Sequence, residues 1–285
     1  MSPSTTTPTT RRGSRRGAWK GRTLAEPMKR DGLVLGMSED EYHGGGSAEL
    51  SSTGAKLLLE APARFKHVVI DGNRTEKKAW DVGTAVHTKV LGTGSPVVAY
   101  PATVLAADGS VRDKAKVWAA EQRAAGMVPV KQRELDQINT VAESLLTHPT
   151  AKALLEAAGN SEASVFASCP EIGVRLRGRF DRLPDDLDVA LDVKTVGQSG
   201  GAAESEFTRQ IFNFGYDVQA GQYLDTLKYA TGRDLDFAFI VVELTAPYLV
   251  NVITMTHTYL EMGRVKSMEA RKRYRHGLDT GEWPG

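Results

Sequence analysis

Residues 171–195, EIGVRLRGRFDRLPDDLDVALDVKT, contain two runs in which apolar and polar residues alternate, joined by a short turn rich in Pro and Asp. A period of two is typical of a half-buried β-strand, so the stretch predicts a β-hairpin. Asp192 and Lys194 share one face of the second strand, because residues two apart on a strand point the same way. The polar face of the first strand carries Arg175, Arg177, Arg179 and Asp181.

Two carboxylates and an amine on adjacent strands outline a metal-dependent hydrolytic site. A divalent cation neutralises a phosphodiester and lowers the pKa of its bound water. Magnesium prefers carboxylate, carbonyl and water oxygens, which Asp181, Asp192 and the Val193 carbonyl would supply. Lys194 would hold the attacking water or stabilise the charge of the transition state. The alternative, which the tripeptide alone leaves open, is a solvated Asp-x-Lys charge pair.

Bulk composition narrows the class of protein. The 285 residues are 41% hydrophobic and 25% charged, as in an ordinary globular chain that can bury a sizeable core. No apolar run is long enough to cross a bilayer, and the first thirty residues lack the apolar segment of a signal peptide. The single cysteine, Cys169, excludes a disulfide framework and a four-cysteine cluster, so we expect a cytoplasmic setting without a membrane partner.

Charge is distributed unevenly along the chain. Residues 1–30 hold eight Lys and Arg against one Glu, a balance of +7, whereas the remaining 28 basic and 34 acidic residues leave −6. We expect residues 1–36 to be a basic, disordered tail and residues 37–285 to form the folded domain. The tail is either a dispensable leader or an electrostatic arm for a polyanion.

Two segments before the hairpin carry further candidates. Ser51 or Ser52 follows a Gly-rich turn and can cap a helix that continues TGAKLLLEAPARFKH. A capped helix N-terminus offers N–H groups that suit a phosphate, although most such caps bind nothing. Residues 76–92 predict a second helix, with Gly83 one turn before His87 in an apolar stripe. A helical histidine without further context is more often structural than a metal ligand.

The rest of the chain is expected to frame the hairpin. Residues 108–158 predict two or three amphipathic helices with no chemistry of their own, a helical insertion in the domain. A strand over 161–168 would pair with the hairpin and place Glu162 at its start as a third carboxylate. Gln219 and Tyr223 are four residues apart and share a helix face. The remaining predicted elements are strands at 236–243 and 248–254 and a helix at about 257–277.

In this order, the motifs resemble the PD-(D/E)XK nuclease superfamily. The likeness is greatest to the C-terminal nuclease domain of exodeoxyribonuclease VIII (RecE) and its phage-encoded relatives. The matching motifs are GTAVH at 83–87, Glu162, the Asp181 that ends RGRFD, DVK at 192–194, and Gln219 with Tyr223. The segments EYHGG, LSSTGAKLLLEAPARFKH and FGYDVQAGQYLD also resemble that domain, so the likeness covers roughly residues 38–255.

The resemblance implies an α/β (α+β) fold with a restriction-endonuclease-like core, a mixed central β-sheet flanked by helices. It also implies a Mg²⁺- or Mn²⁺-dependent exonuclease with one or two ions in each site. Such an enzyme degrades one strand of linear double-stranded DNA, 5′ to 3′, and leaves a 3′ single-stranded overhang for an annealing protein in phage-type recombination. A homo-oligomeric ring around the DNA is a further expectation from the resemblance.

The resemblance also implies roles for individual residues. His87, Asp181, Asp192 and the Val193 carbonyl match metal ligands, and imidazole suits a site that also accepts manganese. Lys194 matches the catalytic lysine, and Glu162 matches an acidic position near a second metal. Gln219 and Tyr223 match the helix motif that supports the site. Ser51 and Ser52 lie where some relatives hold the terminal phosphate.

Several alternatives stay open. Arg175, Arg177 and Arg179 lead to Asp181, so they would contact DNA phosphates or form pairs with acidic neighbours. An endonuclease or junction resolvase would use the same core. A non-catalytic DNA-binding module would keep the fold without the activity, although the intact Asp181, Asp192 and Lys194 argue against this.

Overall fold

A mixed six-stranded sheet forms the centre of the computed structural model, which describes residues 31–43, 48–73 and 82–285. The strand order is β1-β4-β5-β6-β7-β8. Neighbours are antiparallel except β6 and β7, which run parallel. This confirms the expected mixed sheet. The strands are β1 (Gly32–Val34), β4 (Gly159–Ser168), β5 (Arg175–Pro184), β6 (Val189–Val196), β7 (Asp236–Glu243) and β8 (Val250–Thr254).

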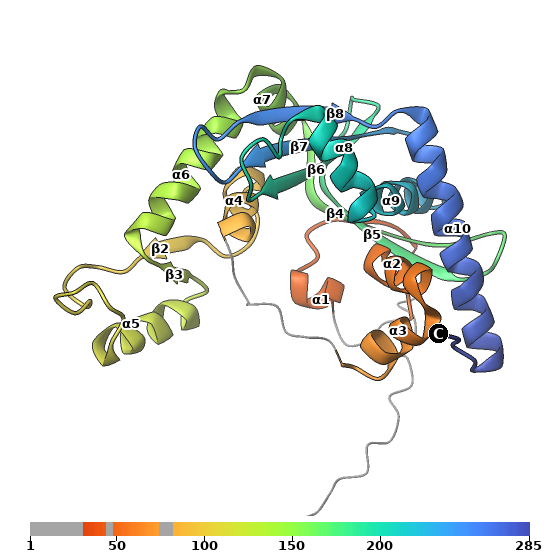
Figure 1. Ribbon diagram of the computed structural model, residues 1–285, viewed down its shortest axis with the longest axis horizontal. Coiled ribbons are helices and arrows are strands. Elements are labelled where there is room, and N and C mark those ends of the chain that lie inside the picture. Colours follow the sequence, from red (N-terminus) through yellow and green to blue (C-terminus); the bar gives the residue numbers. More distant parts are fainter. Residues whose placement is uncertain (1–30, 44–47, 74–81) are drawn as a thin grey trace, which may run out of the picture.

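Helices cover both faces of the sheet, as Figure 1 shows. Side chains on a strand alternate between the two faces of a sheet, so successive residues of β7 belong to two different apolar clusters, one on each face. One face of the sheet packs against α4 (Val82–Leu91), α6 (Gln132–Thr147) and α7 (Pro149–Glu156). The other face packs against α8 (Glu204–Asn213) and α9 (Tyr216–Thr231).

A third apolar cluster joins the two ends of the described chain. It is built from α2 (Ser52–Glu60), α3 (Pro62–Phe65), α9 and α10 (His257–Thr280). A short π-helical segment, Lys66–Ile70, directly follows α3. Trp283 stacks on Phe65 with ring centroids 5.4 Å apart, so the segment after α10 is packed against α3.

Helices α9 and α10 approach so closely that their backbones touch. A Cβ added at Gly221 would lie 2.5 Å from the backbone nitrogen of Arg264. A Cβ added at Gly263 would collide with the backbone oxygen of Asp217. The two glycines therefore permit a crossing that a side chain would prevent. The crossing fixes α9, from which Gln219 and Tyr223 project toward the hairpin.

The predicted hairpin is confirmed as β5 and β6. The Pro- and Asp-rich turn separates the two strands, and Arg182 lies opposite Leu191 in an antiparallel register. The predicted strands before and after it are also present as β4, β7 and β8. β6 lies between β5 and β7, so its residues are covered on both edges and both faces.

The structure corrects two expected boundaries. Gly32–Val34 forms β1 and pairs with β4, so the folded part begins before residue 37. The expected helical insertion near 108–158 is only partly an insertion, because α6 and α7 contribute Ile138, Val141 and Leu155 to the core beneath β6 and β7. Of the helix predicted over 76–92, the described part is α4, and Trp80 lies outside the described residues.

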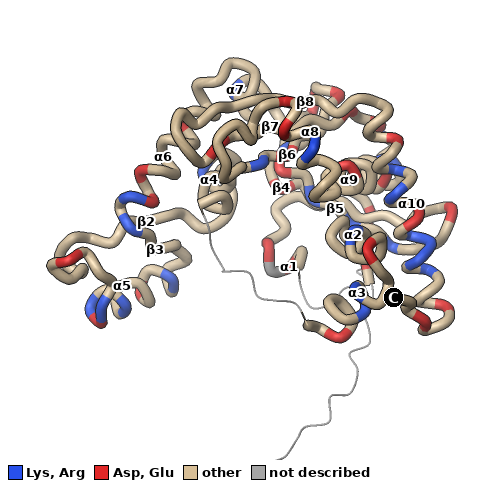
Figure 2. The backbone as a smooth tube through the Cα atoms, viewed as in Figure 1, with Lys and Arg blue, Asp and Glu red and all other residues tan. Residues whose placement is uncertain are grey.

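The remaining elements form an arm beside α4 and α6 (Figure 1). β2 (Val97–Ala99) pairs in parallel with β3 (Val128–Val130), and α5 (Asp113–Ala124) connects them. Basic and acidic residues both occur along α5 and α10, and the basic ones gather in α10 over residues 271–275, as Figure 2 shows. No helix among the described residues is long and apolar enough to span a membrane.

Candidate active site

β6 carries three consecutive residues whose polar groups take part in the site. Asp192, which is 2% exposed, forms an ion pair with Lys194 on the same face of the strand. The other carboxylate oxygen of Asp192 accepts a hydrogen bond of 2.5 Å from Gln219 on α9. The structure therefore brings Asp192, Lys194 and Gln219 together, and the carboxylate is held from two sides.

His87 on α4 connects the two strands of the hairpin. Its Nε2 lies 2.6 Å from the Val193 carbonyl oxygen, which can only accept, so Nε2 carries a proton. In the neutral ring, Nδ1 then keeps its lone pair and faces the Asp181 carboxylate at 3.6 Å. The other contact of this Asp181 oxygen is with the Val193 backbone N–H, which donates to it at 2.7 Å. The Val193 carbonyl, an expected metal ligand, is occupied by His87 here.

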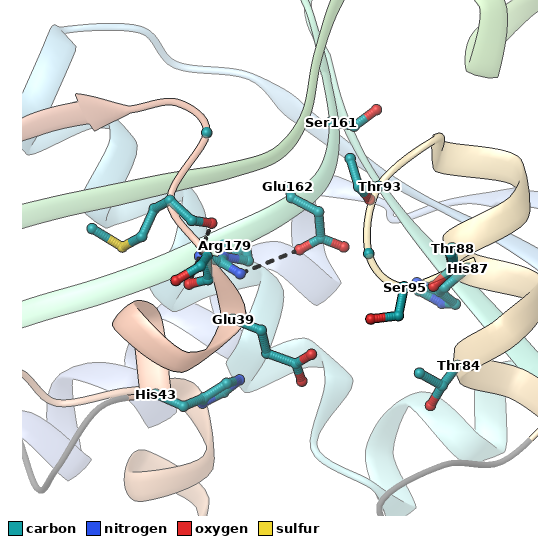
Figure 3. Close-up of a pocket in the computed structure, with 14 residues that line it drawn as sticks. Glu39, His43, Thr84, His87, Thr88, Thr93, Ser95, Ser161, Glu162 and Arg179 are labelled. Atoms are coloured by element: carbon teal, nitrogen blue, oxygen red, sulfur yellow. Dashed lines mark hydrogen bonds and ion pairs between the residues drawn. The ribbon is translucent and has the colours of Figure 1, made fainter. Parts of the chain in front are cut away.

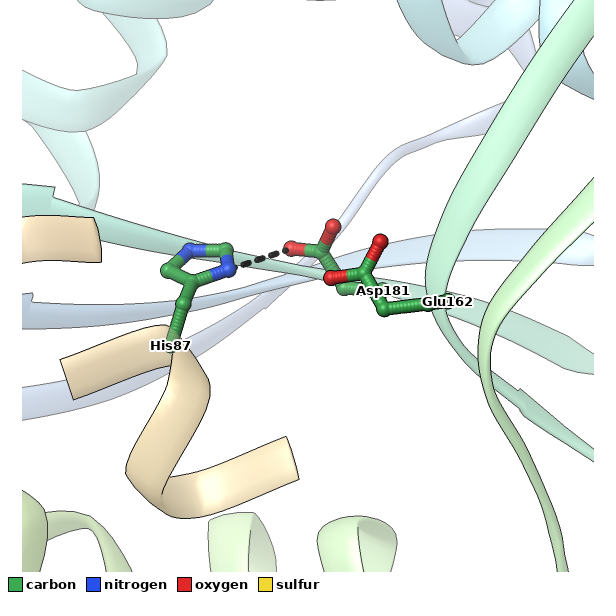
Figure 4. A group of neighbouring side chains, drawn as sticks. All are labelled: His87, Glu162 and Asp181. Carbon is green, nitrogen blue, oxygen red and sulfur yellow. Dashed lines mark ion pairs between the residues drawn. The ribbon is translucent and has the colours of Figure 1, made fainter. Parts of the chain in front are cut away.

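His87, Glu162 and Asp181 form a group of potential metal ligands. One donor atom from each residue lies within 4.8 Å of the other two. Figure 4 shows the imidazole facing both carboxylates, with α4 on one side and the sheet on the other. Glu162 adopts a positive φ of 51° in β4, which is uncommon for a non-glycine residue. One nitrogen and two carboxylate oxygens suit a divalent ion such as Mn²⁺ or Mg²⁺.

The charges around this group are unbalanced without a cation. Burial and the neighbouring Asp192 raise the pKa of Asp181 to about 7, although His87 and Lys194 oppose this. Burial also raises the pKa of Glu162, against the effect of Arg179 and His87. Carboxylates that burial and mutual repulsion push toward their neutral forms are typical of a site that a positive ion completes. The residues present therefore fit a divalent metal.

Lys194 is held as a cation between carboxylates and an aromatic ring. Burial lowers its pKa, but Asp192 and Asp181 together raise the pKa above its usual value. Its Nζ lies 4.8 Å from the ring centroid of Tyr216, a distance at which a cation is attracted to the ring. Tyr216 is not among the site residues that the sequence predicted. Tyr216 lies three residues before Gln219, so both share one face of α9. This spacing is the feature of the sequence that could have placed Tyr216 at the site.

Tyr223, the second residue of the predicted helix motif, lies beneath the hairpin. Its ring packs edge-on against Phe180, with centroids 5.5 Å apart, and it fills the space left by Gly178. Burial raises the pKa of Tyr223 well above its usual value, and hydrogen bonds link its hydroxyl to Ser52 and to Tyr42. The residue supports β5 from below and does not reach the metal group's ligands directly.

The two serines proposed for phosphate binding have different surroundings. Ser51 is the N-cap of α2, and its hydroxyl accepts the backbone N–H of Gly54 at 3.2 Å, as predicted. Ser52 is only 6% exposed and shares its hydroxyl with Tyr223. Ser52 is therefore a buried structural residue, which corrects the expectation that it meets a phosphate. Ser51 keeps that role as a prediction.

Of the two interpretations that the sequence leaves open for the hairpin arginines, the contacts in the structure favour attachment within the protein. Arg177 is 4% exposed, lies over the Tyr42 ring and donates to the Tyr42 carbonyl oxygen at 2.6 Å. Arg179 also lies over that ring and donates to Met37 and Ser38 carbonyl oxygens. Arg175 pairs with Asp31. The three arginines fasten residues 31–43, including α1 (Glu39–His43), to the sheet. Pairing, the alternative interpretation, holds for Arg175 and for Arg179, which lies 3.7 Å from Glu162.

A cavity of about 790 Å³ opens beside the metal-ligand group. His87 and Glu162 line it, as Figure 3 shows. One wall is the segment that the arginines fasten, with Glu39 and His43 directed inward, and the other wall is α4 with the turn that follows it. The volume is in the range of ligand-binding clefts. The sequence does not predict the first wall, because nothing in the spacing of the arginines shows that residues 31–43 cover them.

Comparisons with known proteins agree with this geometry. Residues 51–285 match the model of a family described as a PDDEXK-like domain of unknown function (DUF3799). No curated protein matches the sequence significantly. Among solved structures, one described as "Putative exonuclease" from Eubacterium rectale matches with a TM-score of 0.56 at 13% identity, over 86% of this chain and 88% of that chain.

Two further solved structures match less closely in shape. A phage-related exonuclease from Haemophilus somnus matches with a TM-score of 0.32 at 14% identity, over 71% of this chain and 97% of that chain. An alkaline exonuclease from Laribacter hongkongensis gives a TM-score of 0.28 at 13% identity, over 68% and 93% of the two chains. The fold assignment therefore rests on the family match and on the Eubacterium rectale structure.

Proposed function

Because the chain belongs to the family of PDDEXK-like domains, we propose that it is a metal-dependent DNA exonuclease. The sequence resemblance to the PD-(D/E)XK superfamily is confirmed by the family match, and the fold is the one that it implied. The proposed reaction is hydrolysis of one strand of linear double-stranded DNA from its 5′ end. The product would be a 3′ single-stranded overhang.

The observation that carries the proposal is the convergence of four elements on one point. α4 supplies His87, β4 supplies Glu162, β5 supplies Asp181 and β6 supplies Lys194 paired with Asp192. Residues that lie more than a hundred positions apart in the chain meet at the side of a cavity. Such convergence of potential ligands and one ammonium is what phosphodiester hydrolysis requires.

His87, Glu162 and Asp181 would hold a divalent cation, Mg²⁺ or Mn²⁺, and Asp192 is a further carboxylate close enough to raise the pKa of Asp181. When bound, the cation neutralises the scissile phosphate and lowers the pKa of a water molecule. Gln219 donates to Asp192 and so fixes the direction of its carboxylate. The His87 bond to the Val193 carbonyl keeps Nδ1 available on the side of the carboxylates.

Lys194 is the proposed catalytic residue that the chain itself supplies. Its charge is maintained by Asp192 and Asp181, and the Tyr216 ring covers one side of it. A fixed ammonium beside the scissile phosphate would orient the attacking water and stabilise the negative charge that develops on the phosphoryl oxygens. Because its counter-ions are already in place, little reorganisation is needed when the charge appears.

Digestion of end-labelled DNA tests this proposal. Linear duplex labelled at one 5′ or 3′ end and a covalently closed circle are incubated with Mg²⁺, with Mn²⁺ or with a chelator. We expect mononucleotides from the 5′ end of the linear duplex, no product from the circle, and no reaction with chelator. Cleavage of the circle would indicate an endonuclease or resolvase instead. If neither substrate is cleaved under any metal condition, the result would favour the alternative of a non-catalytic DNA-binding module.

The resemblance also supports two proposals about partners. We propose that identical subunits form a closed ring around the DNA, and that a single-strand annealing protein takes up the exposed 3′ strand. Sedimentation velocity of the full chain would give the number of subunits. Retention of a purified phage-type single-strand annealing protein by the immobilised full chain would test the second partner. A monomer in solution would exclude the ring.

A further inference from the structure

The wall of the cavity formed by α4 is lined by hydroxyl groups. Thr84 and Thr88 belong to α4, and Thr93 and Ser95 belong to the turn that follows it. Ser161 belongs to β4 and directly precedes Glu162, and its hydroxyl accepts a hydrogen bond of 3.3 Å from Arg182. Figure 3 shows these side chains around the same opening as His87 and Glu162. The hydroxyls therefore line the same cavity as two of the proposed metal ligands.

Local structure explains why the hydroxyls gather there. Thr84, His87 and Thr88 are spaced three and four residues apart and lie on one face of α4. The turn folds back over this face because Gly94 has a φ of +89°, and a Cβ there would lie 2.8 Å from the Thr88 hydroxyl oxygen. A residue with a side chain would be strained and would push the turn away from Thr88. The glycine thus keeps Thr93 and Ser95 beside α4.

The hydroxyl-lined wall carries no charge. The described residues around the cavity include one Lys or Arg, and that residue is already bonded within the protein. Among the described residues that line the cavity, Arg179 is the only Lys or Arg. Its guanidinium is bonded to Ser164 at 2.9 Å and to the Met37 carbonyl at 3.0 Å, and it pairs with Glu162. Along the wall formed by α4 and the turn after it, hydroxyls are therefore the main side-chain groups that can donate to a phosphate. Ser and Thr side chains are regular contacts of DNA phosphates and sugars.

We propose that this hydroxyl wall, Thr84, Thr88, Thr93, Ser95 and Ser161, holds the sugar–phosphate backbone of the DNA strand beside the scissile phosphate. The inference rests on the proposed nuclease function and adds the means by which the strand is held. Each hydroxyl can donate to a phosphate oxygen and is indifferent to the base. A neutral surface also releases the strand readily, because no ion pair has to be broken when the strand advances by one nucleotide.

The test compares three variants of the full chain. Thr84→Val with Thr88→Val removes two hydroxyls at nearly constant volume. Thr84→Ser with Thr88→Ser keeps the hydroxyls and removes the methyl groups. Thr140→Val is the matched control, because the Thr140 hydroxyl is exposed on α6 and donates to the Asp136 carbonyl of its own helix. The probe is a short fluorescein-labelled duplex, bound in the presence of Ca²⁺ and followed by anisotropy before any cleavage product forms.

We expect the double valine variant to raise Kd and KM about tenfold, because two hydrogen bonds to the strand are lost. The value of kcat should not change. The double serine variant and the Thr140 control should match the wild type. The dependence of Kd on salt should not change, because that slope counts phosphates contacted by Lys and Arg. If the double valine variant does not fold, Ser95→Ala at an exposed position should raise Kd by a smaller factor.

Two results would overturn the inference. Unchanged Kd and KM in a folded double valine variant would show that the wall does not touch the strand. A weaker salt dependence would show that the substitutions act through a cationic contact. Failure of the proposed function is distinguishable from both: the wild type would then not digest DNA under any metal condition, whereas the anisotropy comparison of the variants would still report whether the hydroxyls bind the backbone.

Discussion

Lys194 is half-buried beside two carboxylates, and its ammonium is the charge that we propose for hydrolysis. Lys194→Ala is expected to lower kcat by about 100- to 1000-fold, the usual cost of one electrostatic stabiliser of the transition state. DNA binding should be largely retained. The matched control is Lys228→Ala, which removes an exposed lysine paired with Asp234.

The assay for Lys194→Ala is single-turnover digestion of labelled linear duplex, with circular dichroism to verify folding. Verification is needed because Asp192 would lose its counter-ion in a buried place. Turnover at the wild-type rate in a folded variant would remove the lysine from the mechanism.

His87 contributes the nitrogen of the metal-ligand group. His87→Ala is expected to weaken Mn²⁺ binding at least about tenfold, since even partners of ligands cost that much when removed. Mg²⁺ binding should fall less, because magnesium prefers oxygen ligands. Isothermal titration calorimetry without DNA measures both affinities.

The control for the metal measurement is His257→Ala, because His257 is 86% exposed at the start of α10. Asp192→Asn belongs in the same series. The sequence predicted that Asp192 is a ligand, whereas its two oxygens here face Lys194 and Gln219. If the His87→Ala variant kept its Mn²⁺ affinity, His87 would not be a metal ligand.

At the scale of elements, two sets of contacts hold parts of the site in place, one at a wall of the cavity and one at α9. The first is the stack of Arg177 and Arg179 on Tyr42, which fastens the segment before α2. Arg177→Leu is expected to lower the free energy of unfolding by about 2–4 kcal/mol, because a buried hydrogen bond from a charged donor and a cation–π contact are lost. Urea unfolding measures the change.

Arg275→Leu is the control for that measurement, since its partner Asp279 is exposed on the same helix and such pairs contribute little. The arginine effect should also appear as new protease cleavage within residues 31–43. If both variants lowered the free energy of unfolding equally, Arg177 would not be what holds residues 31–43 to the sheet.

The second set is the glycine contact between α9 and α10. Gly263→Ala is expected to destabilise the fold by about 3 kcal/mol, because overpacking against the backbone of Asp217 cannot relax. The gain in helix propensity, about 1 kcal/mol, is too small to offset it. Thermal unfolding compares this variant with Gly197→Ala, a glycine whose added Cβ would meet nothing within 4 Å. Equal melting temperatures would contradict the close crossing.

At the scale of the whole molecule, charge is divided between the first thirty residues and the rest. Removing residues 1–30, with their balance of +7, is expected to reduce the salt dependence of DNA binding and to leave kcat unchanged. Anisotropy titrations at several salt concentrations measure the slope. An unchanged slope would support the alternative that this segment is dispensable.

Much of this architecture was predictable from local patterns. The alternation in 171–195 predicted the hairpin, and Ser51 was predicted as the cap of α2. Gln219 was predicted to support the site, and it bonds to Asp192. These residues share one property: spacing along the chain already determines which way they point.

The rest depended on contacts between distant segments, which spacing does not encode. Alternation placed Arg177 and Arg179 on the polar face of β5, but the segment that covers this face comes from residues 31–43. The burial of Ser52 likewise depends on Tyr223, 171 positions later. The two short strands β2 and β3 lack a periodic pattern because each has three residues.

The central position of β6 has a consequence for motion. Leu191 and Val193 are fully buried, whereas Glu39, His43, Thr84 and Ser95 at the rim are exposed. Regions with few buried contacts open more readily than central strands, which open only when the whole fold does. Amide protons of β6 should therefore outlast those of α1 by orders of magnitude in deuterated solvent. The rim of the cavity can therefore open by local motion while Lys194 keeps its position in the central strand.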